Sequence, residues 1–296
     1  MTHTIEVRRI PFEFTADISP TWHAGQPEWS HMVNGASLTM PYLEPFLNRT
    51  LREALDHVED PNLQADIKGF IRQEAQHYAN HRRYNEVLKD NGYPELARVE
   101  ATFEADYKAL QKRSLPWRLA YSAGFETMTM GITEWLINDR QALFHEADST
   151  VTSLVLWHMV EETEHKSVAY DVYQAVCGKY WLRLAGLLWG SLHVGFMSRR
   201  AYRAMLKKDG LWTNLNSRMR LWRMVGRFFR KAGGAMFYAI RHDYHPDQVA
   251  DPQWVDQWRY AFADLPGDML PLLDTGQPTI PPQFIAPRPC STDEQL

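Results

Sequence analysis

The sequence predicts an all-α protein, and three observations support this prediction. Apolar residues recur every three or four positions along several segments, which is the spacing of amphipathic helices. No segment alternates apolar and polar residues as a solvated strand does, and no glycine-rich phosphate-binding loop occurs. Typical helix boundary signals separate the periodic segments: Asp60-Pro61-Asn62, Asn91-Gly92 and Asp148-Ser149.

The same signals divide the chain into four parts. Residues 1–35 contain prolines and little periodicity, so we expect an extended N-terminal arm. Residues 36–178 should form a helical bundle, 179–264 a helical extension packed on it, and 265–296 a Pro-rich tail. We expect helices at residues 38–58, 63–89, 95–113, 114–144 and 149–177, and a last helix that starts at Asp251-Pro252.

Composition excludes several classes of protein. A length of 296 residues allows a sizeable core, and 45% hydrophobic with 23% charged residues is typical of a globular domain. Net charge is −4 and the basic residues are mostly dispersed, which argues against nucleic acid as a partner. Cys177 and Cys290 form no CxxC motif, so a disulfide framework and a thiolate metal site are excluded. The N-terminus lacks an apolar signal-peptide core, and we expect a cytoplasmic protein.

Two segments of the extension are unusually apolar or basic. The string WLRLAGLLWGSLHVGFM at 181–197 is interrupted by Arg183 and His193, so it is marginal as a membrane span. We expect it to be a helix buried in the protein and no transmembrane span, with interfacial membrane contact as the alternative. The string RMRLWRMVGRFFRK at 218–231 predicts a solvated amphipathic helix, with a membrane surface or an acidic partner as alternatives.

Polar residues interrupt two of the apolar helix faces near their middle. One face in the segment 63–89 is apolar at both ends and carries Glu74, His77 and His81 at its centre. A face in the segment 149–177 has the same pattern. Its centre carries His158, Glu162 and His165, and its ends are apolar: Val151, Val155, Ala169, Val172 and Val176. Burying carboxylates and imidazoles is costly unless a partner compensates them, and a divalent metal ion would do so.

The other two long helices of the predicted bundle each contribute a carboxylate. Glu44 and Glu126 both lie within apolar stripes, and each helix precedes one that carries Glu-x-x-His. The chain therefore contains two copies of one unit, in which two bridging carboxylates could hold two cations and each histidine could bind one. Carboxylate and imidazole ligands favour iron or manganese, with zinc as an alternative.

We therefore predict a site for two metal ions. The expected ligands are Glu44, Glu74, His77, Glu126, His158, Glu162 and His165. His81 and Glu161 are predicted either as further ligands or as hydrogen-bond partners of the ligands. Glu134 is a weaker alternative to Glu126, and Glu28-x-x-His31 is excluded because it lies in the predicted arm with no apolar stripe.

The ligand pattern resembles that of known families. One Glu on each of two helices, with Glu-x-x-His on each of the other two, is similar to the ferritin-like di-iron and di-manganese carboxylate proteins, which implies a ferritin-like four-helix bundle. The motif His-x3-Glu-x2-His at 158–165 resembles the p-aminobenzoate N-oxygenase family over residues 36–177. The strings QEAQHYANH (73–81) and WHMVEETEHKSVAYDVY (157–173) resemble a bacterial family catalogued as predicted metal-dependent hydrolases, and this closer match covers most of the chain.

Three functions follow from these observations. The first is an O2-dependent di-iron oxidase or oxygenase that acts on a small hydrophobic substrate and needs an electron donor. The second is a metal-dependent hydrolase that uses a metal-bound water, with Glu161 as a base. The third is iron binding or ferroxidase activity. A homodimer is left open.

Overall fold

The computed structural model describes residues 5–267, 269–277 and 283–285, and it confirms the all-α prediction. The helices are α1 (Pro27–Ser37), α2 (Met40–Ala54), η1 (Leu55–His57), α3 (Pro61–Asp90), α4 (Leu96–Leu110), α5 (Leu115–Asn138), α6 (Arg140–Phe144), α7 (Ser149–Glu164), α8 (Val168–Val176), α9 (Tyr180–Lys208), α10 (Leu215–Tyr238), η2 (Pro246–Gln248) and α11 (Gln253–Ala263). The strands of the described residues, β1 (Leu272–Leu273) and β2 (Phe284–Ile285), form one short antiparallel pair.

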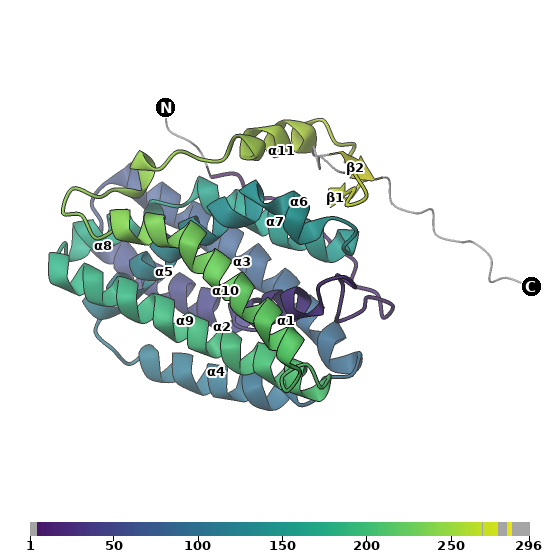
Figure 1. Cartoon of the computed structure of the whole chain (residues 1–296). Helices are drawn as coiled ribbons and strands as arrows, with labels where there is room; N and C mark the ends of the chain where they lie inside the picture. The colour runs from purple at the N-terminus through teal and green to yellow at the C-terminus, as the bar shows by residue number, and fades with distance from the viewer. Residues whose placement is uncertain (1–4, 268, 278–282, 286–296) are drawn as a thin grey trace, which may run out of the picture.

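Helices α2, α3, α5 and the α7–α8 pair surround the interior of the protein (Figure 1). Helix α2 packs along α3, and α5 packs against α2, α7 and α8. Their buried faces supply much of the core, including Leu47, Phe70, Leu119 and Leu154. The apolar stripes seen in the sequence therefore face one another, as ridges of regularly spaced side chains do in packed helices.

Local sequence explains most of the helix boundaries. The Asp60 carboxylate accepts a hydrogen bond from the Asn62 backbone N–H, and the Asp148 carboxylate accepts one from Val151, so both predicted N-caps are present. Helix α3 ends at Asn91-Gly92, where Gly92 has a φ of 113°, a conformation that glycine adopts without steric cost.

The prediction of an extended arm over residues 1–35 is wrong for its last part. Pro27 occupies the first turn of α1, where its fixed φ is favourable, and the helix continues to Ser37. The buried face of α1 is largely polar, so it shows no apolar stripe in the sequence. Glu28 is ion-paired with Arg220, and His31 is hydrogen-bonded to Asp209, which compensates their burial.

Two helices predicted as continuous are interrupted. The segment 114–144 divides at Asp139, whose carboxylate accepts a hydrogen bond from Trp135 Nε1 and pairs with Arg227 of α10. The segment 149–177 divides at residues 165–167, so His165 is the C-cap of α7 instead of a mid-helix residue. Neither break contains proline or glycine, and tertiary contacts of Asp139 and His165 accompany them.

Helix α5 is the bundle helix against which both α9 and α10 of the extension pack (Figure 1). Small residues allow this close packing: Gly124 of α5 lies against Gly186 of α9, and Gly131 lies against Ala232 of α10. A side chain at Gly124 or Gly186 would overlap the backbone of the opposing helix. Because α5 is covered on both sides, it is buried almost throughout.

The prediction that residues 181–197 form a fully buried helix is wrong. Helix α9 packs against α5 and α1 through one face, but it leaves several large apolar side chains exposed. These residues are Trp181, Leu188, Trp189, Leu192 and Phe196. Within the described residues, no helix combines the length and apolar character that crossing a membrane requires.

The tail predicted at 265–296 is described only in part. Thr275 is buried, its hydroxyl donates to the Ala147 carbonyl, and its own carbonyl accepts from Glu146 N–H. Residues 268, 278–282 and 286–296 lie outside the described residues.

Two glycines of α9 provide a test of the α5–α9 contact. Gly186→Ala is expected to lower the free energy of unfolding by about 1–3 kcal/mol, because the added methyl group overlaps the Ala120 backbone and side chain. A Cβ added at Gly195 would meet no atom within 4 Å beyond its own chain neighbours and helix backbone, so Gly195→Ala should raise stability by roughly 0.5–1 kcal/mol through helix propensity alone. Chemical denaturation of both variants measures the difference, and equal effects would contradict the packing described.

Candidate metal centre

Seven buried side chains from the four helices of the bundle lie together in the interior. They form two groups, within each of which the potential ligand atoms lie within 4.8 Å of one another. One group is Glu44, His77 and His158, and the other is Glu74, Glu126, Glu162 and His165. We call these seven residues the metal cluster. All seven were predicted as ligands from the sequence.

The Glu162 carboxylate connects the two groups. Its Oε1 lies 2.8 Å from His158 Nε2, and its Oε2 lies 3.2 Å from His165 Nε2. Glu162 precedes His165 by three residues and follows His158 by four, so one helical face supplies this contact. Because each oxygen faces a different group, Glu162 has the geometry of a carboxylate that could bridge two cations.

Glu74 occupies a corresponding position on α3. Its Oε1 lies 3.3 Å from His165 Nε2, and its Oε2 lies 3.9 Å from His77 Nδ1. The carboxylates of both Glu-x-x-His motifs therefore lie between the two groups, as the repeated unit in the sequence predicts.

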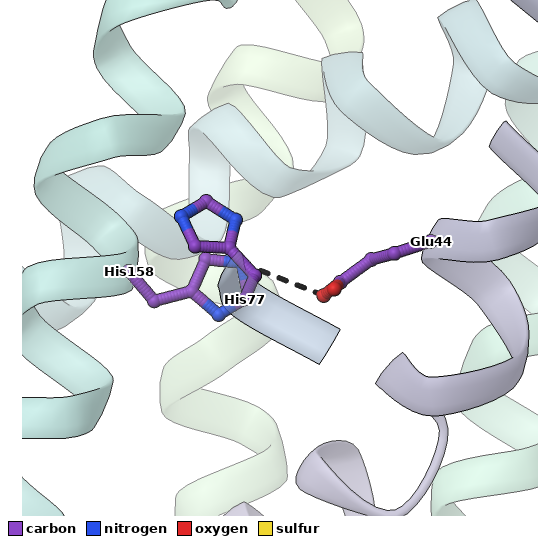
Figure 2. A group of neighbouring side chains, drawn as sticks. All are labelled: Glu44, His77 and His158. Carbon is purple, nitrogen blue, oxygen red and sulfur yellow. Dashed lines mark ion pairs between the residues drawn. The ribbon is translucent and has the colours of Figure 1, made fainter. Parts of the chain in front are cut away.

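The remaining two carboxylates of the cluster, Glu44 and Glu126, belong to different groups. Figure 2 shows the Glu44 carboxylate of α2 pointing toward the imidazoles of His77 and His158, and its Oε1 lies 3.7 Å from His158 Nε2. Glu126 Oε2 of α5 lies 3.9 Å from His165 Nε2. Pro45, which follows Glu44, is accommodated within α2 and does not direct Glu44 away from the cluster.

Each histidine of the cluster is held through its outer ring nitrogen. His77 Nε2 lies 2.9 Å from Glu161 Oε2, and His165 Nδ1 lies 3.0 Å from Gln73 Oε1. Such contacts fix the tautomer and direct the other nitrogen of each ring toward the carboxylates, as partners of metal-binding histidines commonly do.

His158 is held by a chain of hydrogen bonds. Its Nδ1 lies 2.8 Å from His81 Nε2, and His81 Nδ1 lies 2.9 Å from the Ser37 hydroxyl. The Ser37 hydroxyl in turn donates to Asn85 Oδ1. His81 therefore acts as a hydrogen-bond partner of the cluster and not as one of its members.

Glu161 also lies outside the cluster. Its Oε2 contacts His77, and its Oε1 accepts a hydrogen bond from Arg8 at 3.2 Å. Both oxygens are engaged, which does not support the predicted role of Glu161 as a base.

Arg8 and Gln73 were not identified from the sequence as parts of the site. Gln73 adjoins Glu74, which is the only local signal for its role. Arg8 lies in the N-terminal segment, and its contacts with Glu161 and Glu164 join residues more than 150 positions apart, which no local pattern indicates.

The cluster contains more buried polar atoms than the protein satisfies. Both carboxylate oxygens of Glu44 and of Glu74, Oε1 of Glu126 and Nδ1 of His77 have no hydrogen-bond partner. Such groups normally find partners when they are buried, so their gathering in one place indicates a missing ligand.

The pKa values of these carboxyl groups are shifted because they are buried close to one another. Burial, followed by repulsion from neighbouring carboxylates, raises the pKa of Glu44, Glu74 and Glu126 well above the usual value. Burial also acts to raise the pKa of Glu162, but His165 and His158 outweigh it and bring that pKa well below the usual value. Without a cation, the protein cannot keep all four carboxylates ionised at low cost.

The surrounding groups have shifted pKa values as well. Burial raises the pKa of Glu161 to about 8, against the opposing effect of Arg8. Burial, reinforced by His158, lowers the pKa of His77 and of His81 well below the usual value. His77 is therefore neutral, which is the form that binds metal ions.

This donor set fits two divalent cations. Four carboxylates and two cations balance in charge, and oxygen with imidazole nitrogen is a suitable ligand set for first-row metals. Aromatic rings complete the surroundings, because Trp157 contacts His77 edge-on and Phe70 lies 4.6 Å from His165 between ring centroids. These rings help to exclude water and so strengthen electrostatic contacts within the site.

The other acidic candidates lie elsewhere. Glu134 is exposed on α5 and does not join the cluster. Glu28 and His31 are buried on α1 with partners of their own, as described above. In the part of the chain that the structure describes, no further group of three potential metal ligands is present.

Comparison with known proteins identifies one family. The model of a family described as predicted metal-dependent hydrolase matches residues 6–250, which include every residue of the metal cluster. No curated protein and no solved structure matches the chain significantly.

Removing one carboxylate of the cluster should weaken metal binding and yet stabilise the metal-free protein. Glu74→Gln is expected to reduce bound metal from about two ions per chain to less than one. The same change should raise the unfolding free energy of the metal-free protein by roughly 1 kcal/mol, because a neutral amide avoids the cost of either burying an ionised carboxylate at this position or protonating it. Elemental analysis and chemical denaturation in a chelator measure the two effects.

Glu134→Gln on α5 is the matched control, since Glu134 is exposed and distant from the cluster. It should change neither the amount of bound metal nor the unfolding free energy of the metal-free protein. A Glu74→Gln protein that retains its metal, or that is destabilised without metal, would contradict the proposed ligand role of Glu74.

Loss of the Glu161 contact should weaken metal binding without eliminating it. Glu161→Gln leaves the shape of the side chain nearly unchanged but offers one acceptor oxygen where both oxygens now contact Arg8 and His77, so His77 is oriented less firmly and metal affinity is expected to fall roughly 10- to 100-fold. Glu6 also pairs with Arg8 but is mostly exposed, which makes Glu6→Gln the control. Competition with a chromophoric chelator measures the affinity, and equal values for the two variants would exclude the positioning role.

Proposed function

Because this chain belongs to the family of predicted metal-dependent hydrolases, we propose that it is a hydrolase whose two metal ions are bound by the metal cluster. The observation that carries this proposal is the convergence of four buried carboxylates and three imidazoles whose unpartnered atoms face one another. When bound, the two ions would acidify a coordinated water and polarise the bond to be cleaved.

The residues of the cluster would have distinct roles. Glu74 and Glu162 would bridge the ions, since each of these carboxylates faces both groups. His77, His158 and Glu44 would bind one ion, and His165 and Glu126 the other. The hydrogen bonds of Glu161, His81 and Gln73 would keep the three imidazoles in the required orientation.

If one oxygen of Glu44 binds an ion, its second oxygen is the best candidate in the cluster to accept a proton during hydrolysis. The Glu44 carboxylate has no hydrogen bond, and its nearest ionic contact is His158 at 3.7 Å, so it is held less firmly than Glu162.

Oxidation with O2 is a second candidate, and the donor set favours it. All four carboxylates are glutamates, six of the seven residues lie within helices, and His165 directly follows one, as is typical of di-iron and di-manganese carboxylate bundles. The ligands are nearly inaccessible to water, with Glu44 and Glu74 only 1% exposed. Redox-active ions at this site would supply electrons for reduction of O2, and an external donor would have to restore them.

Two measurements on the full chain distinguish these reactions. A hydrolase should cleave chromogenic carboxylic or phosphoric esters after loading with zinc or manganese, and oxygen should make no difference. An oxidase should consume O2 after anaerobic loading with ferrous iron, at roughly two irons per chain. In either case Glu74→Gln should reduce the rate by at least about 100-fold, the loss expected when a metal ligand is removed.

Glu134→Gln serves again as the control and should retain full activity. Ester hydrolysis that persists in a chelator would exclude metal-dependent hydrolysis. Oxygen consumption without ester cleavage would replace the first proposal by the second, and a protein that binds no divalent metal would exclude both.

A further inference from the structure

The outward face of α10 is an apolar ridge. Leu215, Met219, Trp222, Phe229 and Phe237 are all exposed, and their spacing of three, four or seven to eight positions keeps them on one side of the helix. Trp222 is 64% exposed and Phe229 is 63% exposed, although aromatic side chains of this size are normally covered. Contiguous exposed apolar residues of this kind mark interaction surfaces.

Helix α9 presents a second exposed apolar face. From Trp181 to Phe196 its exposed residues are uncharged, and they are Trp181, Ala185, Leu188, Trp189, Leu192, Gly195 and Phe196. From Arg199 to Lys208 the exposed residues of the same helix are all basic. Both α9 and α10 pack against α5, and both run across the front of the molecule in Figure 1.

Charge in these two helices has a single sign. Together they contain 12 of the chain's 32 Lys and Arg residues and none of its 36 Asp and Glu residues, although the whole chain has a net charge of −4. Some of these cations are paired, such as Arg220 with Glu28 and Arg227 with Asp139. Within the described residues, Arg223 and Arg230 are exposed beside the apolar ridge and form no ion pair.

A basic groove lies where the apolar part of α9 meets its basic part. It has a volume of about 470 Å³ and is lined by Phe196, Arg199, Arg200, Arg203 and Lys207, together with Val99 and Ala204. Arg200 pairs with Asp106, whereas Arg199, Arg203 and Lys207 form no ion pair within the described residues. Three such cations beside the Phe196 ring suit a phosphate group that is attached to an apolar chain.

We propose that the exposed faces of α9 and α10 form a docking surface for an anionic phospholipid membrane. The apolar ridge and the uncharged part of α9 would enter the boundary between headgroups and acyl chains, and the basic residues would contact the lipid phosphates. Tryptophan, phenylalanine and leucine beside a basic polar face are the usual features of helices that lie in a membrane interface. This proposal does not depend on the function of the metal cluster.

The charge pattern favours an anionic membrane over a second copy of the chain. Two copies of this surface placed face to face would bring like charges together, because neither helix contains an acidic residue. A membrane also accommodates separate apolar ridges on two helices without requiring a complementary groove.

Sedimentation of the full chain with lipid vesicles tests the proposal. The protein should bind vesicles that contain phosphatidylglycerol and phosphatidylcholine, bind pure phosphatidylcholine far less, and dissociate as salt is added. The double variant Arg223→Gln/Arg230→Gln should weaken partitioning about 10-fold or more. The double variant Trp222→Ser/Phe229→Ser should weaken it by at least a similar factor.

Matched controls lie outside the two helices. Arg9→Gln/Arg82→Gln removes two exposed arginines, and Tyr260→Ser removes an aromatic residue that is 75% exposed on α11; neither should change partitioning. Metal content and circular dichroism verify that every variant is folded. Three outcomes would each overturn the proposal. The α10 variants and the control variants could bind vesicles equally, the protein could fail to bind anionic vesicles, or it could form a dimer in solution that the Trp222→Ser/Phe229→Ser change dissociates.

Discussion

Four carboxyl groups share a space from which water is largely excluded, and much of the structure can be understood from the cost of that arrangement. An ionised group in such surroundings costs several kcal/mol, and like charges add to this cost. The bundle compensates Glu162 through His158 and His165, but it leaves Glu44 and Glu74 without hydrogen bonds. Metal-free protein must therefore protonate some of these carboxyls, whereas two divalent cations would stabilise all four in the ionised form.

The same constraint accounts for parts of the fold that lie outside the bundle. Arg8 of the N-terminal segment reaches Glu161, which orients His77, and Ser37 at the end of α1 contacts His81, which orients His158. Segments that looked peripheral in the sequence thus determine which nitrogen of each imidazole faces the carboxylates. Loss of the N-terminal segment would act on the cluster through these contacts, without removing a ligand.

The sequence predicted the helices well, and it predicted which buried polar residues would lie together, because both depend on local spacing. Residues three or four positions apart share a helical face, so Glu74 with His77 and Glu162 with His165 could be identified before their partners were known. Tertiary contacts have no such local pattern. The link from Arg8 to Glu161, the break at His165 and the exposure of Trp189 each depend on how distant segments pack, and for this reason they were missed or predicted wrongly.

Helix α5 contacts both parts of the protein to which we assign functions, the buried metal cluster and the layer formed by α9 and α10. One side of it carries Glu126 toward the cluster, and its glycines bring α9 and α10 close on another side. Packed helix axes are separated by about 8–10 Å, so the exposed faces of α9 and α10 lie only about one helix layer beyond α5. The backbones of α5 and α9 meet so closely at Gly124 and Gly186 that an added methyl group would not fit there, so α5 holds the exposed faces at a fixed distance from the cluster. A membrane bound to those faces would therefore be separated from the cluster by packed helices, so membrane docking and metal binding can be tested independently of each other.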